Sequence, residues 1–305
     1  MHDKDCLHRF MFEDFPIRGH LVHLDAAWRA LIEHREYPPL IRDMLGEAVA
    51  ASVLLSATIK FDGTLSLQLQ GDGPVHLMLA QCTSGFGVRG LARYQEDSRS
   101  GGFTGISGVE ELIGPGNLTV TLDAEDKGQR YQGIVPITGE RLAGSLQRYF
   151  EDSEQLPTRL WLHADAQGAS GLLLQRLPNE GGGQRDTDSP ELEDAWRRVQ
   201  LIGETLTAEE LATLSDTQIL HRLFNEDDVR LYDPAPVYFR CRCSRERVGG
   251  MLQGLGEAET RSVLAERGEV EVRCDFCNRA YLFDAIDVEQ LFKSAIAGGN
   301  GTRVH

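Results

Sequence analysis

Four cysteines stand in two short pairs near the C-terminus of this 305-residue chain. The first pair is Cys241-Arg-Cys243 and the second is Cys274-Asp-Phe-Cys277, with residues 244–273 between them. Zinc prefers tetrahedral coordination by thiolates, and two such pairs joined by a folded spacer supply four sulfurs. The spacing therefore predicts one Zn²⁺ per chain, held by Cys241, Cys243, Cys274 and Cys277.

The same cysteines could also respond to oxidants. Cys-x-Cys is a less usual zinc knuckle than Cys-x-x-Cys and places two thiols within reach of each other, and the small, strained ring that a disulfide would close there is easily reduced. Nearby cations keep thiolates populated and could offset an anionic zinc centre. The flanking arginines are Arg240, Arg242, Arg245, Arg273 and Arg279. The simpler alternative is that the cysteines only staple a small domain, with solvated arginines around it.

A compact zinc domain is predicted around these pairs, over residues 238–297, with a loose tail at 298–305. Ser244 is expected to cap a helix that carries Val248, Met251, Leu252 and Leu255. Val270 and Val272 predict a strand that leads into the second pair, residues 281–283 predict another, and Val288, Leu291 and Phe292 predict a closing helix. A core of this size rarely supplies more than ~3–5 kcal/mol, whereas structural zinc contributes about 10–16 kcal/mol. Loss of zinc should therefore unfold the domain.

The first part of the chain, residues 1–178, predicts an α+β domain of hairpins separated by helices. Alternating apolar residues predict three hairpins, at 65–69 with 75–79, 118–122 with 131–137, and 159–163 with 172–177. Helical spacing predicts helices over 26–37, 40–59 and 140–155. Asp25 is expected to cap the first, and one apolar face of the second should pack on a sheet.

Residues 179–237 predict a flexible stretch followed by a metastable helical linker. Residues 179–190 are rich in glycine and charge, and Thr207 with Glu210 and Ser215 with Gln218 match capping boxes within helices over 191–223. Their polar faces leave only a modest apolar stripe, so the helices should be marginal alone. If these helices rest against the zinc domain, they would loosen with it and expose an apolar surface for client proteins: Trp196, Val199, Ile202, Leu220, Leu223 and Phe224.

Composition narrows the classes of function. The chain is 41% hydrophobic and 26% charged, with a net charge of −16. That charge disfavours nucleic acid, because binding to phosphates relies on Lys and Arg. The N-terminal residues lack the pattern of a signal peptide, so a cytoplasmic location is expected, and no apolar run is long enough to span a membrane.

Several stretches resemble the heat shock protein 33 family, bacterial redox-regulated holdase chaperones. The first motif continues from Cys241 as Cys-Arg-Cys-Ser-Arg-Glu-Arg, and the second reads Cys-Asp-Phe-Cys-Asn from Cys274. Tyr149-Phe150 leading into Ser-Glu-Gln-Leu-Pro-Thr at 153–158, and Arg-Leu-Phe-Asn-Glu at 222–226, also match. The resemblance spans nearly the whole chain.

This resemblance implies a non-enzymatic, ATP-independent holdase. The four cysteines would bind zinc when reduced and form Cys241–Cys243 and Cys274–Cys277 disulfides on oxidation, with zinc release and unfolding of the linker. It further implies a homodimer when oxidised, and clients that are unfolded or oxidatively damaged proteins. Cys6 and Cys82 have no part in the family motif.

Two other functions remain open from the residues alone. A zinc-stapled binding module, such as a nucleic-acid adaptor, would need only the ligand set, although the negative charge disfavours it. A thiol oxidoreductase could use the Cys-x-x-Cys, but the βαβ context of such motifs is missing. The nine histidines show no metal spacing, and His20 and His23 are expected simply to decorate a strand.

Overall fold

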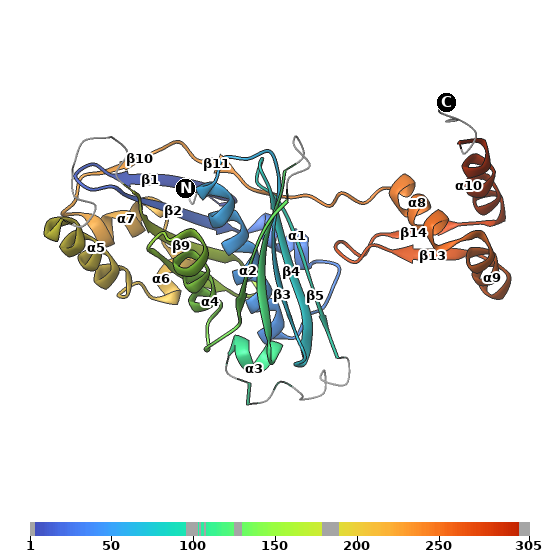
Figure 1. Ribbon diagram of the computed structural model, residues 1–305, viewed down its shortest axis with the longest axis horizontal. Helices are drawn as coiled ribbons and strands as arrows, with labels where there is room; N and C mark the ends of the chain where they lie inside the picture. Colours follow the sequence, from blue (N-terminus) through green and yellow to red (C-terminus); the bar gives the residue numbers. More distant parts are fainter. Residues whose placement is uncertain are drawn as a thin grey trace, which may run out of the picture. The chain divides into compact units, whose positions relative to one another are not determined.

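The computed structural model describes residues 4–95, 103, 105–106, 108–124, 130–178 and 189–298. The described residues up to Arg240 form one compact unit, and those from Cys241 onward form a second. Two six-stranded sheets and most of the helices make up the first unit, and a two-stranded sheet with three helices makes up the second (Figure 1). The α+β class predicted from the sequence is confirmed.

The first sheet has the strand order β10-β1-β2-β9-β8, with β11 also pairing with β1, and all its pairings are antiparallel. Its strands are β1 (Cys6–Phe12), β2 (Ile17–Leu24), β8 (Thr158–Ala164), β9 (Ala169–Arg176), β10 (Val229–Leu231) and β11 (Ala235–Pro236). The predicted hairpin at 159–177 is confirmed as β8 and β9. β1 was not predicted, and of β2 the sequence indicated only that His20 and His23 lie on a strand, because both strands bury side chains on both faces and so lack clean alternation.

The second sheet has the order β12-β5-β4-β3-β6-β7. Its strands are β3 (Gly63–Gly71), β4 (Val75–Thr83), β5 (Gly87–Tyr94), β6 (Gly116–Ala124), β7 (Arg130–Pro136) and β12 (Tyr238–Phe239). Both hairpins predicted in this part of the chain are confirmed, β3 with β4 and β6 with β7. The short β12 pairs in parallel with β5, directly before the first cysteine pair.

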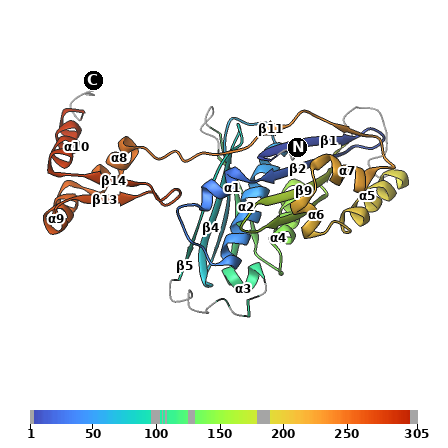
Figure 2. The same ribbon diagram turned by 180° about the vertical axis from the view of Figure 1, so that it is seen from behind.

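Helix α2 (Pro39–Thr58) lies between the two sheets, and Figures 1 and 2 show it there from both sides. The sequence predicted this helix with one buried face. In the structure residues 48–56 are buried without a break, because strands of both sheets contact the helix. Small residues such as Ala50, Ala51 and Ser52 allow this close approach from the second side.

Helix α1 (Ala26–Ile32) is shorter than predicted, and its expected cap is wrong. Asp25 makes no capping bond and instead forms ion pairs with Lys4 and Arg29. The carboxylate of Asp5 accepts hydrogen bonds from the backbone N–H groups of residues 25, 26 and 27 at 2.8–2.9 Å. An acceptor twenty residues upstream in the chain leaves no signal in the local sequence.

The remaining helices of the first part are α3 (Val109–Ile113), which was not predicted, and α4 (Leu142–Tyr149). A π-helical turn, η2 (Phe150–Glu154), extends α4, so the predicted helix over 140–155 is confirmed with altered geometry at its end. Gln155 closes the turn in a left-handed conformation, φ 54°.

The linker helices are α5 (Pro190–Gly203), α6 (Ala208–Thr213) and α7 (Asp216–Phe224), and both predicted capping boxes are present. Residues 179–188 lie outside the described residues. The apolar faces of these helices pack on one side of the first sheet, in a cluster separate from the core around α2. The sheet contributes Phe10, Phe12, Ile17, Leu21, Leu172 and Leu174, and the helices contribute Trp196, Val199, Leu211, Ile219, Leu220, Leu223 and Phe224.

The second unit consists of α8 (Arg245–Leu255), α9 (Glu257–Arg267), β13 (Val270–Arg273), β14 (Ala280–Phe283) and α10 (Ala285–Gly298). Ser244 caps α8 as predicted, accepting from the Arg247 N–H at 3.2 Å. Met251 and Leu255 are more than half exposed, so only Val248 and Leu252 carry the buried face of that helix. Helix α9 was not predicted, and its charged sequence buries only Thr260.

The core of this second unit is small. Seven buried residues form it: Val248, Leu252, Val270, Tyr281, Phe283, Val288 and Phe292. Among the described residues of the whole chain, no helix has the length and apolar character needed to cross a membrane.

Candidate metal centre

The four cysteines of the two pairs lie together in the second unit. Cys241 and Cys243 precede α8, whereas Cys274 and Cys277 occupy the turn between β13 and β14. Sγ of Cys241 lies 3.6 Å from Sγ of Cys274, and Sγ of Cys243 lies 3.4 Å from Sγ of Cys277. All four sulfurs lie within 4.8 Å of one another, and none is in a disulfide.

These separations match a tetrahedral site for a single ion. With zinc–sulfur bonds of 2.3 Å, the sulfurs of such a site are about 3.8 Å apart. The donor set, four thiols and no carboxylate, is that of a structural zinc site with no open position. The residues therefore fit a four-thiolate metal ion, with each cysteine of the first pair close to one cysteine of the second.

The second pair is held by the hairpin turn itself. The Cys274 N–H donates to the Arg279 carbonyl at 3.0 Å, and the Asn278 N–H donates to the Cys274 carbonyl at 2.8 Å. Asn278 adopts a left-handed conformation, φ 54°, which tightens the turn so that both sulfurs face the first pair. This Cys-x-x-Cys therefore lies between two antiparallel strands, in a setting unlike the strand-to-helix turn of a thiol oxidoreductase.

Tyr281 supports the site from β14. Its hydroxyl donates to Sγ of Cys243 over 3.1 Å. Although burial opposes ionisation, this bond and the bonds from the other cysteines lower the pKa of Cys243 to about 7. Burial raises the pKa values of Cys241 and Cys277. One thiolate is thus stabilised at neutral pH, and a cation is needed before all four can ionise together.

Among the flanking arginines, Arg279 interacts electrostatically with the cysteines. A hydrogen bond with Tyr281, followed by the charges of Tyr281, Cys243 and Cys277, raises the pKa of Arg279. Arg245 instead pairs with Asp287 at 2.6 Å and stacks over the Phe283 ring, and Arg273 pairs with Glu271. These two arginines brace the fold of the second unit.

The other two cysteines lie in the first unit, both buried. Burial raises the pKa of Cys82 to about 12, so it is an inert core thiol. Cys6 belongs to a polar cluster that sequence reasoning missed, with His8, His23 and Asp216. His23 does more than decorate a strand. No local motif could have revealed the cluster, because Asp216 is more than 190 residues from each of its partners.

Comparisons with known proteins agree with the fold. The family model described as Hsp33 protein matches residues 5–284. A 33 kDa chaperonin of Nitrosococcus oceani is 48% identical over 296 residues and covers 97% of each chain. A 33 kDa chaperonin of Methylobacillus flagellatus is 45% identical over 305 residues, covering 99% of this chain and all of its own.

A solved structure is also similar. The crystal structure of the 33 kDa chaperonin of Thermotoga maritima, a heat shock protein 33 homologue, superposes with a TM-score of 0.78. It covers 96% of this chain and 99% of its own, at 23% identity, and so supports the fold alone. From the family model and the extent of these matches, the chain belongs to the Hsp33 family, a family of chaperones and not of enzymes.

Proposed function

We propose that this protein is a redox-regulated, ATP-independent holdase chaperone, in which the four cysteines bind one Zn²⁺ when reduced. It would bind thermally or oxidatively unfolding proteins and prevent their aggregation, without enzymatic turnover. The observation that carries the proposal is the gathering of four thiol sulfurs within 4.8 Å in a unit with a very small core. Family membership supports the same role.

The stability of the second unit supports a dependence on metal. Bound zinc would hold the four thiolates together and neutralise half of their charge. Structural zinc contributes about 10–16 kcal/mol in small zinc modules, more than the ~3–5 kcal/mol of a core of this size. The chain's own residues would then hold the ligands in register through the β13–β14 turn and the Tyr281 hydroxyl.

Oxidation would remove this ligand set. Each disulfide forms from two thiols with loss of two protons and two electrons, and the electrons reduce an oxidant such as a peroxide. The sulfurs lie close enough for the proposed Cys241–Cys243 and Cys274–Cys277 disulfides to form with local rotation. Disulfide sulfurs are poor ligands compared with thiolates, so the cysteines no longer hold the ion and the second unit loses its main source of stability.

A client surface is available beneath the linker helices α5–α7. Their apolar faces cover one side of the first sheet, and unfolding of the linker would expose helix and sheet residues together. Four of these are aromatic, Phe10, Phe12, Trp196 and Phe224, each contributing roughly 150–250 Å². Together they amount to about 600–1,000 Å², at or above the ~300–600 Å² of the largest apolar patch on an ordinary monomer.

The chain between the linker helices and the cysteines offers a route by which unfolding of the second unit would reach those helices. After α7 the chain returns as β10 and β11 beside β1, then as the two-residue β12 beside β5. The Arg240 N–H donates to the Val88 carbonyl at 2.9 Å, and Cys241 is the next residue. Such short pairings are easily lost when the following unit unfolds.

The proposal extends to location and assembly. The protein would work in the cytoplasm, where thiols are normally reduced and oxidation is a signal. In the oxidised state it would form a homodimer, since an exposed apolar surface also favours self-association. Its partners would be unfolded proteins, and the net charge of −16 disfavours nucleic acid.

A client-aggregation assay tests the function. The reduced, zinc-loaded protein and the protein treated with peroxide at mild heat are each added to an unfolding client, and light scattering is followed. We expect suppression only by the oxidised form, with one zinc released per chain. The control is a Cys82→Ser variant, which should behave like the parent. The proposal is lost if the oxidised protein releases zinc but leaves aggregation unchanged.

A further inference from the structure

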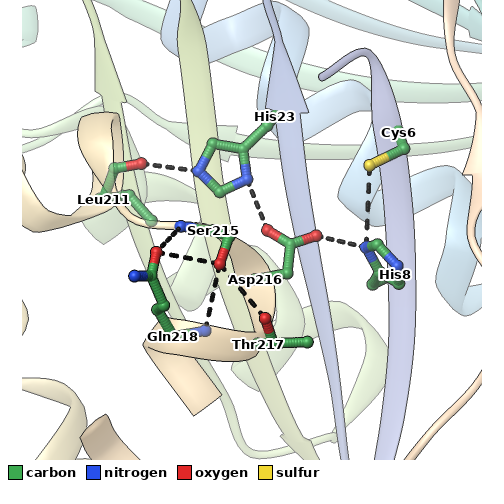
Figure 3. Close-up of polar contacts among 8 residues, drawn as sticks. All are labelled: Cys6, His8, His23, Leu211, Ser215, Asp216, Thr217 and Gln218. Carbon is green, nitrogen blue, oxygen red and sulfur yellow. Dashed lines mark hydrogen bonds and ion pairs between the residues drawn. The ribbon is translucent and has the colours of Figure 1, made fainter. Parts of the chain in front are cut away.

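A buried polar cluster fixes the linker helices to the first sheet. Figure 3 shows His8 on β1 and His23 on β2 pointing toward the carboxylate of Asp216, the first residue of α7. The side chain of Asp216 is 1% exposed, that of His8 5% and that of His23 15%. A carboxylate buried to this extent is costly unless it is paired, so its partners decide whether α7 can dock.

The hydrogen bonds define how many protons the cluster holds. Nε2 of His23 lies 2.8 Å from the Leu211 carbonyl of α6, which can only accept, so Nε2 carries a hydrogen. Nδ1 of His23 lies 2.6 Å from Oδ1 of Asp216. A proton must lie in this contact too, because a ring nitrogen lone pair and a carboxylate oxygen would repel each other. His8 contributes the second partner, with Nδ1 in hydrogen-bond contact with Oδ2 of Asp216.

We propose that docking of α6 and α7 on the first sheet requires one bound proton, shared between His23 and Asp216, so that rising pH loosens the linker. With the proton, the pair is an imidazolium and a carboxylate, which attract each other. Without it, two acceptors face each other 2.6 Å apart in a buried site. His23 contacts α6 through the Leu211 carbonyl and α7 through Asp216.

The pKa shifts of His23 and Asp216 agree with one proton bound between them. Although burial favours a neutral ring, the hydrogen bond to Asp216, the charge of Asp216 and the Leu211 carbonyl raise the pKa of His23. Burial disfavours the Asp216 carboxylate, yet hydrogen bonds from His23 and His8 lower the pKa of Asp216. Both shifts favour the ion pair. Asp216 also lies in the first turn of α7, where the helix dipole stabilises a negative charge.

Other charged groups near the cluster are largely paired. A cavity of about 390 Å³ opens onto His23, lined also by Lys4, Asp25, Arg29, His163 and Asp165. Lys4 and Arg29 pair with Asp25, and His163 lies 3.9 Å from Asp165. On the β1 side, Sγ of Cys6 lies 3.7 Å from Nδ1 of His8. The cavity gives water a path to His23 and therefore allows its proton to exchange.

A proton fits this site better than a metal ion. Sγ of Cys6, Nδ1 of His8 and a carboxylate oxygen of Asp216 lie within 4.8 Å of one another. However, Oδ2 of Asp216 is in hydrogen-bond contact with Nδ1 of His8, and Oδ1 forms an ion pair with Nδ1 of His23. Two ligands of a tetrahedral ion with bonds near 2 Å lie about 3.3 Å apart, whereas Nδ1 of His8 and Oδ2 of Asp216 are in direct hydrogen-bond contact, closer than two such ligands.

The direction of the pH effect follows from linkage. The pKa of His23 is raised in the docked state, so its contribution is complete below the unfolded value of ~6.5 and is lost as pH rises through the docked-state pKa. Between these two values one proton is released on opening, and the opening equilibrium rises by up to about tenfold per pH unit. Easier oxidative activation at mildly alkaline pH would follow, and that consequence alone depends on the proposed function.

Hydrogen exchange of the reduced, zinc-loaded full chain tests the inference without any client. Amides of α6 and α7 are followed from about pH 6 to about pH 9, with correction for the intrinsic exchange rate. We expect their protection to fall as pH rises above ~6.5, and to lose this pH dependence in His23→Gln. The matched control is His163→Gln, which changes a histidine on the rim of the same cavity and should keep the parent's pH dependence.

Two further measurements keep the inference falsifiable if His23→Gln does not fold. Asp216→Asn should also remove the pH dependence, and the ¹⁵N shifts of the His23 ring should report a doubly protonated imidazole at neutral pH. Protection of α7 that is independent of pH in the parent, or a neutral His23 ring, would overturn the inference. So would a second equivalent of zinc that is lost in Cys6→Ser.

Discussion

At the scale of single residues, spacing in the sequence identified the thiols but not what surrounds them. Cys241, Cys243, Cys274 and Cys277 could be selected because zinc ligands come in short local pairs. The hydroxyl of Tyr281 and the positive φ of Asn278 depend on how β14 returns beside β13, and no local pattern encodes that return. The His8–Asp216–His23 cluster was missed for the same reason, with partners on three separate elements.

The first residue-scale prediction concerns Tyr281. Tyr281→Phe removes the O–H donor to Sγ of Cys243 and keeps most of the packing of the ring. Loss of a partner that orients a ligand typically lowers metal affinity by about 10–100-fold. Competition with a chromophoric chelator would measure this, with Tyr238→Phe in the first unit as the control. Unchanged zinc affinity in Tyr281→Phe would show that the hydroxyl is not part of the site.

The second residue-scale prediction concerns Cys82. Burial raises its pKa to about 12, so the thiol stays protonated and unreactive from neutral pH to about pH 9. In the reduced protein freed of zinc, in which the first unit stays folded, alkylation followed by mass spectrometry should label Cys243 well before Cys82. Cys243 should react before Cys82 at every pH in that range. Rapid labelling of Cys82 would contradict its assignment as an inert core thiol.

At the scale of elements, the sequence predicted the helices and strands whose sequence signals are local. The capping boxes of α6 and α7, the three hairpins and the helix α2 all carry their signals within a few residues. Elements that are buried on both faces, such as β1 and β2, have no alternation to read. Helix α9 buries only Thr260, and its Val263 and Leu264 are partly buried against the core of the second unit, so its charged sequence shows little apolar periodicity.

The element-scale prediction concerns the linker. Leu223 on α7 is 4% exposed and belongs to the cluster on the first sheet, so Leu223→Ala should destabilise the docked linker by about 2–5 kcal/mol. We expect partial chaperone activity of the reduced variant, measured by client aggregation. Leu201→Ala is the control, because Leu201 on α5 is 61% exposed and its truncation should leave the reduced protein inactive. Equal behaviour of the two variants would argue against the linker as the cover of the client surface.

At the scale of the whole molecule, the two compact units differ in what stabilises them. The first has two sheets and an α2-centred core, whereas the second has a seven-residue core beside four thiols. The sequence predicted the zinc domain from its cysteines, and its start at residue 238 lies three residues before the boundary of the second unit. It could not predict that the linker helices pack on the first sheet, because the sheet residues that receive them come from β1, β2 and β9.

The whole-molecule prediction follows from this difference. Removing zinc from the reduced protein with a chelator should unfold the second unit while the core around α2 remains folded. Hydrogen exchange would show fast exchange in β13 and β14 and retained protection in β3 and β6. Restoring zinc under reducing conditions should restore protection. Chelation that leaves the second unit protected would mean that its own core suffices.

The central claim is that oxidation of the four cysteines releases the linker and uncovers its apolar surface. Its most direct test is hydrogen exchange of α5–α7 through one cycle of oxidation and reduction, with disulfide mapping and client binding measured on the same samples. We expect the amide protection of α5–α7 to fall as the disulfides form while client binding rises in parallel. Both changes should reverse on reduction and zinc addition. Client binding by an oxidised protein whose α5–α7 amides remain fully protected would contradict it.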